Sequence, residues 1–197
     1  GREPSRASLA GAEERQKTLT PFPDVVSLGE LPAAEAAAHQ SRGLDMIASG
    51  QVAALLLAGG QGTRLGTNAP KGCYDIGLPS GKSLFQYHAE RILKVRRLAA
   101  AHKGVSPAQV KLKLLVMTSS ATDAETRAFF AAHDHFGLGS EGVHFFEQGM
   151  LPCLTMEGKL MLEAPGALAM APNGNGGCYM SMRDAGLLTA LERDGVK

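Results

Sequence analysis

The sequence lacks an excess of charge of either sign. It has 20 Lys and Arg residues against 19 Asp and Glu residues, which leaves a formal net charge of +1 over 197 residues. A chain with so small a net charge has no general field to attract a long polyanion, so nucleic acid is not expected as a partner. A cluster of cations from Lys94 to Arg97 falls within a predicted helix and is interpreted as a solvated face.

Cysteine is scarce, and long apolar runs are absent. The three cysteines, Cys73, Cys153 and Cys178, are odd in number and do not have the spacing of metal ligands, which favours a reducing, cytoplasmic location. No apolar run approaches the ~20 residues that a transmembrane helix needs. Charged residues also occupy the amino-terminal positions where a signal peptide would be apolar. We therefore expect no membrane partner.

The apolar content and its periodicity predict an α/β fold. Hydrophobic residues make up 44% of the chain, enough for a sizeable core. Short apolar runs typical of buried strands alternate with segments of helical character, which favours a Rossmann-like, mostly parallel sheet with right-handed connections. The expected strands span residues 52–58, 112–117 and 143–146, and the expected helices span residues 32–50, 83–102, 122–133 and 179–193, the last broken at Gly186.

Local signals refine these boundaries. Ser83 with Gln86, and Thr122 with Glu125, have the spacing of capping boxes at the starts of helices. Residues 154–162, with a Glu-Gly pair in the middle, predict a hairpin.

A glycine-rich segment directly follows the first predicted strand. Residues 55–66 read LLLAGGQGTRLG, and Pro70 and Lys71 close the segment. Glycine has no β-carbon, so the turn can point its N–H groups inward and let a ligand approach the main chain. Arg64 and Lys71 add the fixed positive charge that a polyphosphate requires. We therefore predict a nucleotide site at the end of this strand.

Two parts are predicted along the chain. Residues 1–20 are polar and weakly patterned, so residues 1–50 are interpreted as a flexible start followed by a helical segment. The core begins near residue 51. Residues 51–197 are interpreted as the nucleotide-binding part of a single domain.

Other familiar sites do not fit the sequence. Leu65 stands where the dinucleotide fingerprint would need glycine after Gly60 and Gly62, which disfavours a nicotinamide or flavin fold. Residues 81–83 (GKS) lack the glycine five positions earlier that a P-loop requires, so they are interpreted as a helix start. Residues 133–135 (HDH) lie at a predicted helix end, where neighbouring side chains diverge, and no metal site is predicted there.

Polar residues near the predicted loop have simpler interpretations than catalysis. Asp75 is interpreted as a turn-capping carboxylate. Ser119, Ser120 and Cys73 have no evident base partner, so no covalent nucleophile is predicted.

Taken together, the motifs resemble those of the nucleotide-sugar pyrophosphorylases, and more closely the eukaryotic UDP-N-acetylglucosamine pyrophosphorylase branch. The family pattern LLLAGGQGTRLG is present at residues 55–66, PKGxYDxGLPS at residues 70–80 and AERI at residues 89–92. A segment similar to FxQxxLP follows at residues 146–152, and one similar to APDGNGG follows at residues 170–177. The order of the motifs is that of the family.

The resemblance implies a uridylyltransferase that joins UTP and N-acetylglucosamine 1-phosphate, giving UDP-N-acetylglucosamine and pyrophosphate with Mg²⁺ as cofactor. It implies that Arg64 and Lys71 neutralise the triphosphate and stabilise charge at the α-phosphorus, which makes them the expected catalytic residues. The resemblance also implies that Lys71 takes part in binding the nucleotide. The other nucleotide-binding residues that it implies, which act through main-chain groups or side-chain amides, are Leu57, Ala58, Gly59, Gly60, Gln148, Gly174 and Asn175.

The chain also departs from the family pattern. Asn173 stands where the family most often has aspartate, which removes a negative charge beside the nucleotide. The family's metal-binding aspartate and its sugar-binding half would follow Lys197, so the fold is expected to be incomplete and to hold no metal ligand. Two alternatives stay open: a module that binds uridine nucleotide without catalysis, and a related pyrophosphorylase that acts on another sugar 1-phosphate.

Overall fold

The chain divides into two compact units. The computed structural model describes Thr20 and residues 22–197, with only the backbone at Arg64. One unit comprises the described residues up to Ala38 together with Pro152–Met170, and the other comprises His39–Leu151 and Ala171–Lys197. The flexible start predicted from the sequence falls almost wholly in residues 1–19, outside the described residues. The predicted boundary near residue 50 stays a prediction.

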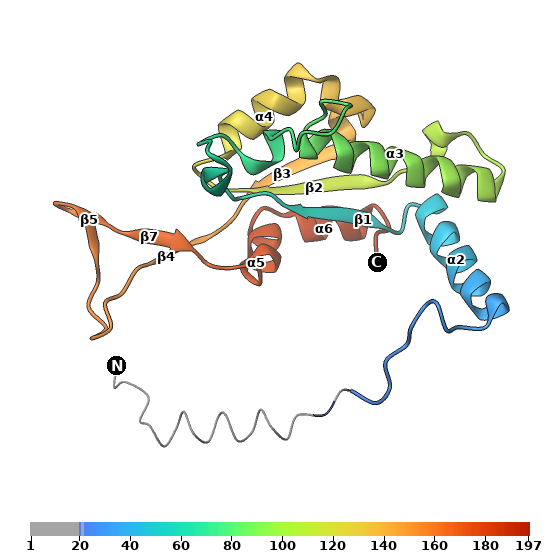
Figure 1. Cartoon of the computed structure of the whole chain (residues 1–197), viewed down its shortest axis with the longest axis horizontal. Coiled ribbons are helices and arrows are strands. Elements are labelled where there is room, and N and C mark those ends of the chain that lie inside the picture. The colour runs from blue at the N-terminus through green and yellow to red at the C-terminus, as the bar shows by residue number, and fades with distance from the viewer. Residues whose placement is uncertain (1–19, 21) are drawn as a thin grey trace. The chain divides into compact units, whose positions relative to one another are not determined.

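A parallel sheet forms the centre of the larger unit (Figure 1). β1 (Ala53–Leu57), β2 (Lys113–Thr118) and β3 (Val143–Glu147) are paired in that order. In this register the end of β1 lies beside β2, and the last residue of β2 lies beside the last residue of β3. The carboxyl ends of the three strands therefore meet at one edge. The predicted strands and their parallel arrangement are confirmed.

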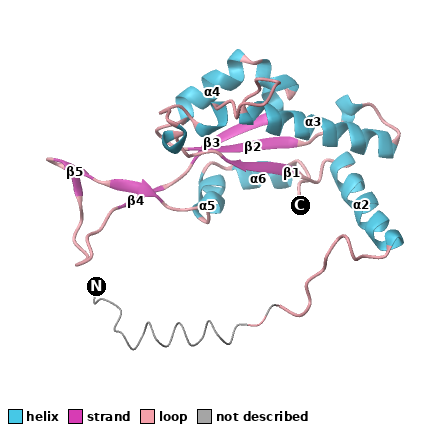
Figure 2. Cartoon of the chain, viewed as in Figure 1, coloured by secondary structure: helices cyan, strands magenta, loops and turns pink. Residues whose placement is uncertain are grey.

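Helices cover both faces of this sheet. The α-helices are α2 (Ala33–Ala48), α3 (Leu84–Lys103), α4 (Asp123–Ala132), α5 (Gly177–Asp184) and α6 (Leu187–Arg193). α3 and α4 lie on one face, whereas α5 and α6 lie on the other (Figure 2). In the described part of the chain, five short 3-10 helices lie in the connections: η1 (Thr63–Leu65), η2 (Lys71–Cys73), η3 (Pro107–Gln109), η4 (Asp134–Gly137) and η5 (Ser140–Gly142). Among the described residues, no helix combines the length and the apolar character needed to cross a membrane.

Alternate residues of β2 build two separate cores. Leu114 and Val116 belong to a buried cluster with residues of α3 and α4. Leu115 and Met117 belong to a second cluster with residues of α5 and α6. Successive side chains of a strand point to opposite faces, so the continuous apolar run of β2 is what a strand covered on both sides requires.

β1 departs from the expectation that it would be buried on both faces. Leu55 and Leu57 are 39% and 43% exposed, whereas Leu56 packs against the core that includes α3 and α4. In the described part of the chain, β1 has β2 as its only paired neighbour. A strand at the edge of a sheet has a neighbour on one side alone, which leaves these leucines accessible.

The ends of the helices follow the predicted signals in part. The Ser83 hydroxyl caps α3 by accepting the Gln86 N–H at 3.2 Å. The Gln86 side chain does not complete the capping box, because its Nε2 donates to Glu90 at 3.1 Å. The predicted break at Gly186 is confirmed, since this residue separates α5 from α6 with a φ of +70°.

The smaller unit contains the hairpin that the sequence predicts. Leu154 pairs with Leu160 across the turn, and the Thr155 N–H donates to the Lys159 carbonyl at 2.8 Å. Gly158 lies in the turn with a φ of +80°, a conformation that favours glycine. In the same unit, β5 (Leu162–Ala164) pairs with β6 (Ala167–Leu168). Outside the three-stranded sheet, β4 (Met150–Pro152) pairs with β7 (Met170–Pro172).

Replacing Phe130 with alanine should destabilise the larger unit strongly. Its ring is fully buried and makes edge-on contacts with Phe85, Phe136 and Phe145, with centroid distances of 5.0, 5.2 and 5.2 Å. We expect the free energy of unfolding, measured by chemical denaturation, to fall by about 3–5 kcal/mol. The matched variant Phe129→Ala changes a half-buried ring and should lose clearly less. An equal loss in both variants would contradict this description of the core.

Candidate functional site

Three segments of the chain meet where the parallel strands end. β1 continues into Ala58, whose N–H donates to the Met117 carbonyl at 2.7 Å. β3 continues into Gln148, whose N–H donates to the Thr118 carbonyl at 2.8 Å. The pairing thus extends past the ends of β1 and β3 and holds the glycine-rich loop, the end of β2 and Gln148 at one edge. Ligands of open parallel sheets bind at this edge.

The glycine-rich loop is closed on itself by main-chain hydrogen bonds. The Gly62 N–H donates to the Ala69 carbonyl at 2.9 Å, and the Lys71 N–H donates to the Gly60 carbonyl at 3.1 Å. Residues 60–71 therefore turn back on themselves. Side chains of the loop add to this closure, since Gln61 Nε2 donates to the Asn68 carbonyl at 3.4 Å and Thr67 Oγ1 accepts the Ala69 N–H at 3.1 Å.

The two predicted cations lie on this loop. The backbone of Arg64 forms part of η1, and Lys71 begins η2 with an exposed side chain. The bond between the Lys71 N–H and Gly60 places the start of the lysine side chain beside the glycines. The structure therefore brings Lys71 and the glycine turn together, as the sequence predicted.

Gln148 is held in a defined orientation between two glycines. Its Nε2 donates to the Gly174 carbonyl at 3.2 Å. A carbonyl can only accept, so this bond assigns the amide and leaves Oε1 as a free acceptor. Oε1 lies 2.9 Å from the position that a β-carbon on Gly59 would occupy. Residues predicted from three separate motifs are thus in contact, with an acceptor oxygen beside the glycine turn.

Asn173 and Asn175 lie in the turn that leads into α5. Asn175 is exposed, and its carbonyl accepts the Cys178 N–H at 3.2 Å. Asn173 packs so closely on Gly177 that a β-carbon there would lie 2.0 Å from Asn173 Oδ1. This Oδ1 is buried and has no hydrogen-bond partner in the described part of the chain. A neutral amide avoids the larger cost of burying an unpaired carboxylate at this position.

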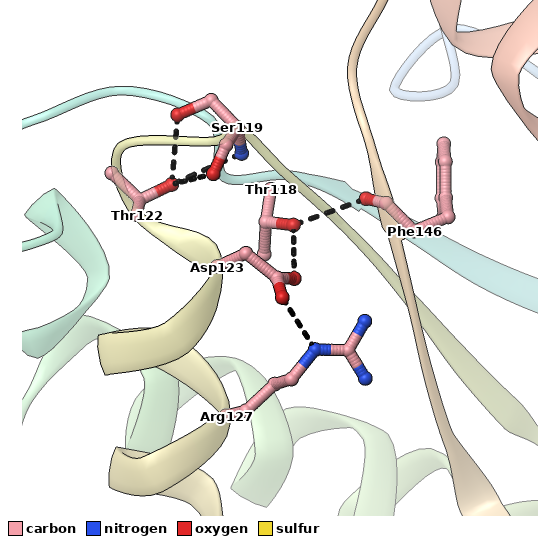
Figure 3. A network of polar contacts seen from close by, with 6 residues as sticks. All are labelled: Thr118, Ser119, Thr122, Asp123, Arg127 and Phe146. Carbon is pink, nitrogen blue, oxygen red and sulfur yellow. Dashed lines mark hydrogen bonds and ion pairs between the residues drawn. The ribbon is translucent and has the colours of Figure 1, made fainter.

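A buried hydroxyl that the sequence did not reveal, that of Ser119, contacts the glycine turn, and a second buried hydroxyl, that of Thr122, contacts Ser119 (Figure 3). Ser119 Oγ donates to the Gly59 carbonyl at 2.8 Å and lies 3.0 Å from Thr122 Oγ1. The capping box predicted for Thr122 and Glu125 is wrong, because Thr122 makes no side-chain cap bond to α4 and bonds with Ser119. Serine and threonine hydroxyls often bind nearby groups in this way.

Asp123 ties the start of α4 to the ends of the strands (Figure 3). Its carboxylate accepts hydrogen bonds from the Thr118 hydroxyl and from Arg127 Nε, both at 2.6 Å. The Thr118 hydroxyl also lies 3.2 Å from the Phe146 carbonyl of β3. Burial acts to raise the pKa of the Asp123 carboxyl, but the bonds from Arg127 and Thr118 outweigh burial, so its pKa lies below the ordinary value.

Other polar groups near the loop have structural roles. Lys82 pairs with Glu90 at 2.8 Å, which agrees with a helix start and not a P-loop. Asp75 Oδ1 accepts the Gly77 N–H at 2.9 Å, the turn-capping role predicted for it. Burial is the main cause that raises the pKa of the Cys73 thiol to about 11, so this thiol is protonated near neutral pH and is a poor nucleophile.

Comparison with known proteins assigns the chain to a family. Residues 13–197 match the family described as UTP--glucose-1-phosphate uridylyltransferase. The chain belongs to this family. The resemblance to nucleotide-sugar pyrophosphorylases that the motifs indicated is therefore confirmed.

Members of the uridylyltransferase family with high similarity carry names that refer to UDP-N-acetylglucosamine. The chain is 50% identical over 156 residues to UDP-N-acetylglucosamine diphosphorylase 1 of Arabidopsis thaliana. It is 44% identical over 156 residues to UDP-N-acetylglucosamine pyrophosphorylase of Saccharomyces cerevisiae. Each match covers 79% of this chain and 31% of the relative, so the chain spans about a third of the length of these curated relatives.

A solved structure of the uridylyltransferase family has the same fold. The crystal structure of the uridine diphosphate N-acetylglucosamine pyrophosphorylase from Trypanosoma brucei, in complex with an inhibitor, superposes with a TM-score of 0.76 at 34% identity. The match covers 95% of this chain and 40% of that chain. The predicted fold class, a mostly parallel sheet of the nucleotide-sugar pyrophosphorylase type that is incomplete in this chain, is confirmed.

Gly59→Ala should destabilise the protein, whereas Gly60→Ala should not. A β-carbon on Gly59 would lie 3.3 Å from the Thr118 carbonyl as well as close to Gln148, but nothing lies within 4 Å of one on Gly60. We expect a loss of about 1–3 kcal/mol for Gly59→Ala and a change within about 0.5 kcal/mol for Gly60→Ala. Denaturation of the ligand-free protein measures both. Indistinguishable variants would contradict the close approach at Gly59.

Asp123→Asn should lower stability at neutral pH and weaken its dependence on pH. A carboxyl whose pKa is depressed in the folded state stabilises it above the unfolded pKa of about 3.9, and this contribution is lost as the pH falls through the folded pKa. We expect a loss of about 1–3 kcal/mol at pH 7 that shrinks below about pH 4 in urea denaturation.

Asp184→Asn is the control for this experiment. Asp184 pairs with Arg183 at 2.8 Å, but both side chains are 64% exposed. Exposed pairs contribute little, so this variant should match the wild type at every pH. The difference in the free energy of unfolding between the wild type and Asp123→Asn should shrink as the pH falls. A difference that stays constant or widens would show that the Asp123 charge does not stabilise the fold.

Proposed function

We propose that this chain forms the uridine-nucleotide site of an enzyme that joins UTP and N-acetylglucosamine 1-phosphate. The products are UDP-N-acetylglucosamine and pyrophosphate. The observation that carries the proposal is the convergence of the glycine turn, Gln148 and Gly174 at one sheet edge. Support comes from the 50% identity to a UDP-N-acetylglucosamine diphosphorylase.

Gln148 provides the polar contact for base recognition. Its amide is oriented by Gly174, and its Oε1 acceptor stands beside Gly59. Uracil offers an N–H donor between two carbonyl acceptors, so an amide oxygen together with main-chain groups can bind it in one orientation. The main-chain groups proposed for this role belong to Leu57, Ala58, Gly59 and Gly60, and Asn175 would contact the nucleotide or the sugar of the product.

Arg64 and Lys71 are proposed to act on the phosphates. A phosphate oxygen of the sugar phosphate attacks the α-phosphorus of UTP, and the bond to the β-phosphate breaks to release pyrophosphate. Cations placed beside the triphosphate neutralise its charge and stabilise the charge that develops during this in-line displacement. This chemistry requires no covalent nucleophile, in agreement with the raised pKa of Cys73.

Mg²⁺ is proposed as the cofactor of the complete reaction. Among residues 22–197 as described, no three His, Cys, Asp or Glu side chains converge as metal ligands. The described residues therefore do not form a protein site for the ion. Triphosphate oxygens are themselves ligands that Mg²⁺ prefers.

A cytoplasmic location is part of the same proposal. All three cysteines of the chain are free thiols. Free thiols are typical of reducing compartments, which supports this location.

A second candidate function differs from the first in the sugar phosphate, which would be glucose 1-phosphate. The family is described by glucose 1-phosphate, whereas the relatives reported above are named for UDP-N-acetylglucosamine. We propose N-acetylglucosamine 1-phosphate because the relatives with that name are 44% and 50% identical to this chain. Competition between the two sugar phosphates in a turnover assay distinguishes the candidates, and preference for glucose 1-phosphate would favour the second.

A nucleotide-binding module without catalysis is the other candidate. The chain spans 31% of the length of the two curated relatives reported above, and the contacts described at the sheet edge belong to the proposed nucleotide site. Binding of UTP without release of pyrophosphate, when the native full-length protein is supplied with both substrates, would support this candidate.

Lys71→Ala in the native full-length protein should reduce turnover far more than stability. We expect kcat/KM for UTP to fall by about 10²–10³-fold, since a charge aimed at the reacting phosphates is lost. The melting temperature should stay unchanged because the Lys71 side chain is exposed. Lys82→Ala removes a cation that pairs with Glu90 and should keep activity near that of the wild type. Normal turnover by Lys71→Ala would refute the role assigned to this lysine.

A further inference from the structure

The glycine turn needs an external support to hold one conformation. Glycine loses more conformational freedom on ordering than any other residue, so a run of glycines does not fix its own peptide planes. A site that binds phosphates through main-chain groups gains affinity when those groups already point in the required direction. In this structure, the Gly59 carbonyl accepts a hydrogen bond from Ser119 Oγ at 2.8 Å.

The direction of the hydrogen bonds follows from counting protons. Each hydroxyl has one proton, and the Gly59 carbonyl has none to give, so Ser119 donates its proton to Gly59. The donor in the 3.0 Å contact between the two hydroxyls is then Thr122, whose other acceptor, the Ser119 carbonyl, lies farther away at 3.5 Å. Thr122 Oγ1 also accepts the Ser119 N–H at 3.1 Å. The result is a row of hydrogen bonds in which Thr122 donates to Ser119 and Ser119 donates to Gly59.

This row of hydrogen bonds orients the peptide group between Gly59 and Gly60. A peptide group is planar and trans, so the Gly59 carbonyl and the Gly60 N–H point in opposite directions. Fixing the carbonyl on Ser119 therefore aims the Gly60 N–H away from Ser119. In the described part of the chain, this N–H is bonded to no other group, whereas the Gly60 carbonyl accepts the Lys71 N–H. Ser119 and Lys71 thus hold two successive peptide groups of the turn, Gly59–Gly60 and Gly60–Gln61.

The support itself is rigid because it is buried and anchored. Ser119 is 6% exposed, and Thr122 is fully buried. The Ser119 carbonyl accepts the N–H groups of Thr122 and Asp123 at 2.9 and 2.8 Å, at the start of α4. Asp123 is in turn held by Thr118 and by Arg127 (Figure 3).

We propose that Ser119 and Thr122 are positioning residues for nucleotide binding, which orient the Gly59–Gly60 peptide by a relay of two buried hydroxyls. This inference rests on the proposed function, because it names the groups that prepare the same loop for UTP. Neither residue needs to touch the substrate. Their effect reaches the nucleotide through the backbone of the loop.

Variants of the native full-length protein test the relay. Ser119→Ala and Thr122→Val each remove one hydroxyl, and each should raise KM for UTP about fivefold to tenfold with kcat changed less than twofold. The double variant should be no worse than Ser119→Ala, because both hydroxyls act through one bond. Thr122→Ser keeps the hydroxyl and should behave like the wild type.

Thr126→Val is the matched control for a lost buried hydroxyl. Thr126 lies one turn further along α4, is fully buried, and its Oγ1 has no hydrogen-bond partner among the described residues. Its removal should leave KM for UTP unchanged. If Ser119→Ala and Thr122→Val match this control in KM, the relay does not position the loop.

Hydrogen exchange in the ligand-free protein separates this inference from the proposed function. Ser119→Ala should speed exchange of the Gly62 and Lys71 amides, which close the loop, and leave the amides of β2 unchanged. If the wild-type protein does not turn over UTP, the proposed function fails, and exchange alone decides the relay. Unchanged protection of Gly62 and Lys71 in Ser119→Ala would overturn it.

Discussion

The parallel pairing of β1, β2 and β3 is the constraint on which the rest of the structure depends. Because all three strands run the same way, their carboxyl ends meet at one edge. The glycine turn, Ser119 and Gln148 are far apart in the sequence and become neighbours only through this pairing. The two cores on either side of β2 hold the sheet, so core packing and site geometry are linked.

The edge is built mainly from neutral groups whose directions are fixed by hydrogen bonds. Gly174 orients the Gln148 amide, Ser119 holds the Gly59 carbonyl, and Lys71 binds Gly60 through its backbone. Fixed dipoles at the site need no rearrangement when a charged ligand binds, which is an advantage for phosphate chemistry. The proposed contacts of Arg64 and Lys71 with the phosphates would therefore start from a backbone that is already ordered.

The sequence predicted the elements with strong periodicity and the residues carried by motifs. It identified β1, β2, β3, α3 and the glycine loop, because apolar runs and glycine spacing are local signals, but it did not predict β4 or β7. It did not predict the exposure of Leu55 and Leu57, which depends on the position of β1 in the sheet. It also missed the contact between Ser119 and Gly59, since no local pattern reports a bond between residues 60 positions apart. Thr122 was assigned to a cap because both roles use the same residue type, and only the fold decides between them.

Isothermal titration of this chain with UTP tests the central claim, that the edge of the sheet is a uridine-nucleotide site. The account predicts binding by the wild-type chain and clearly weaker binding by the Arg64→Ala/Lys71→Ala double variant. Titrations with and without Mg²⁺ would show how far the ion contributes. Absence of UTP binding by a chain shown to be folded would contradict the claim.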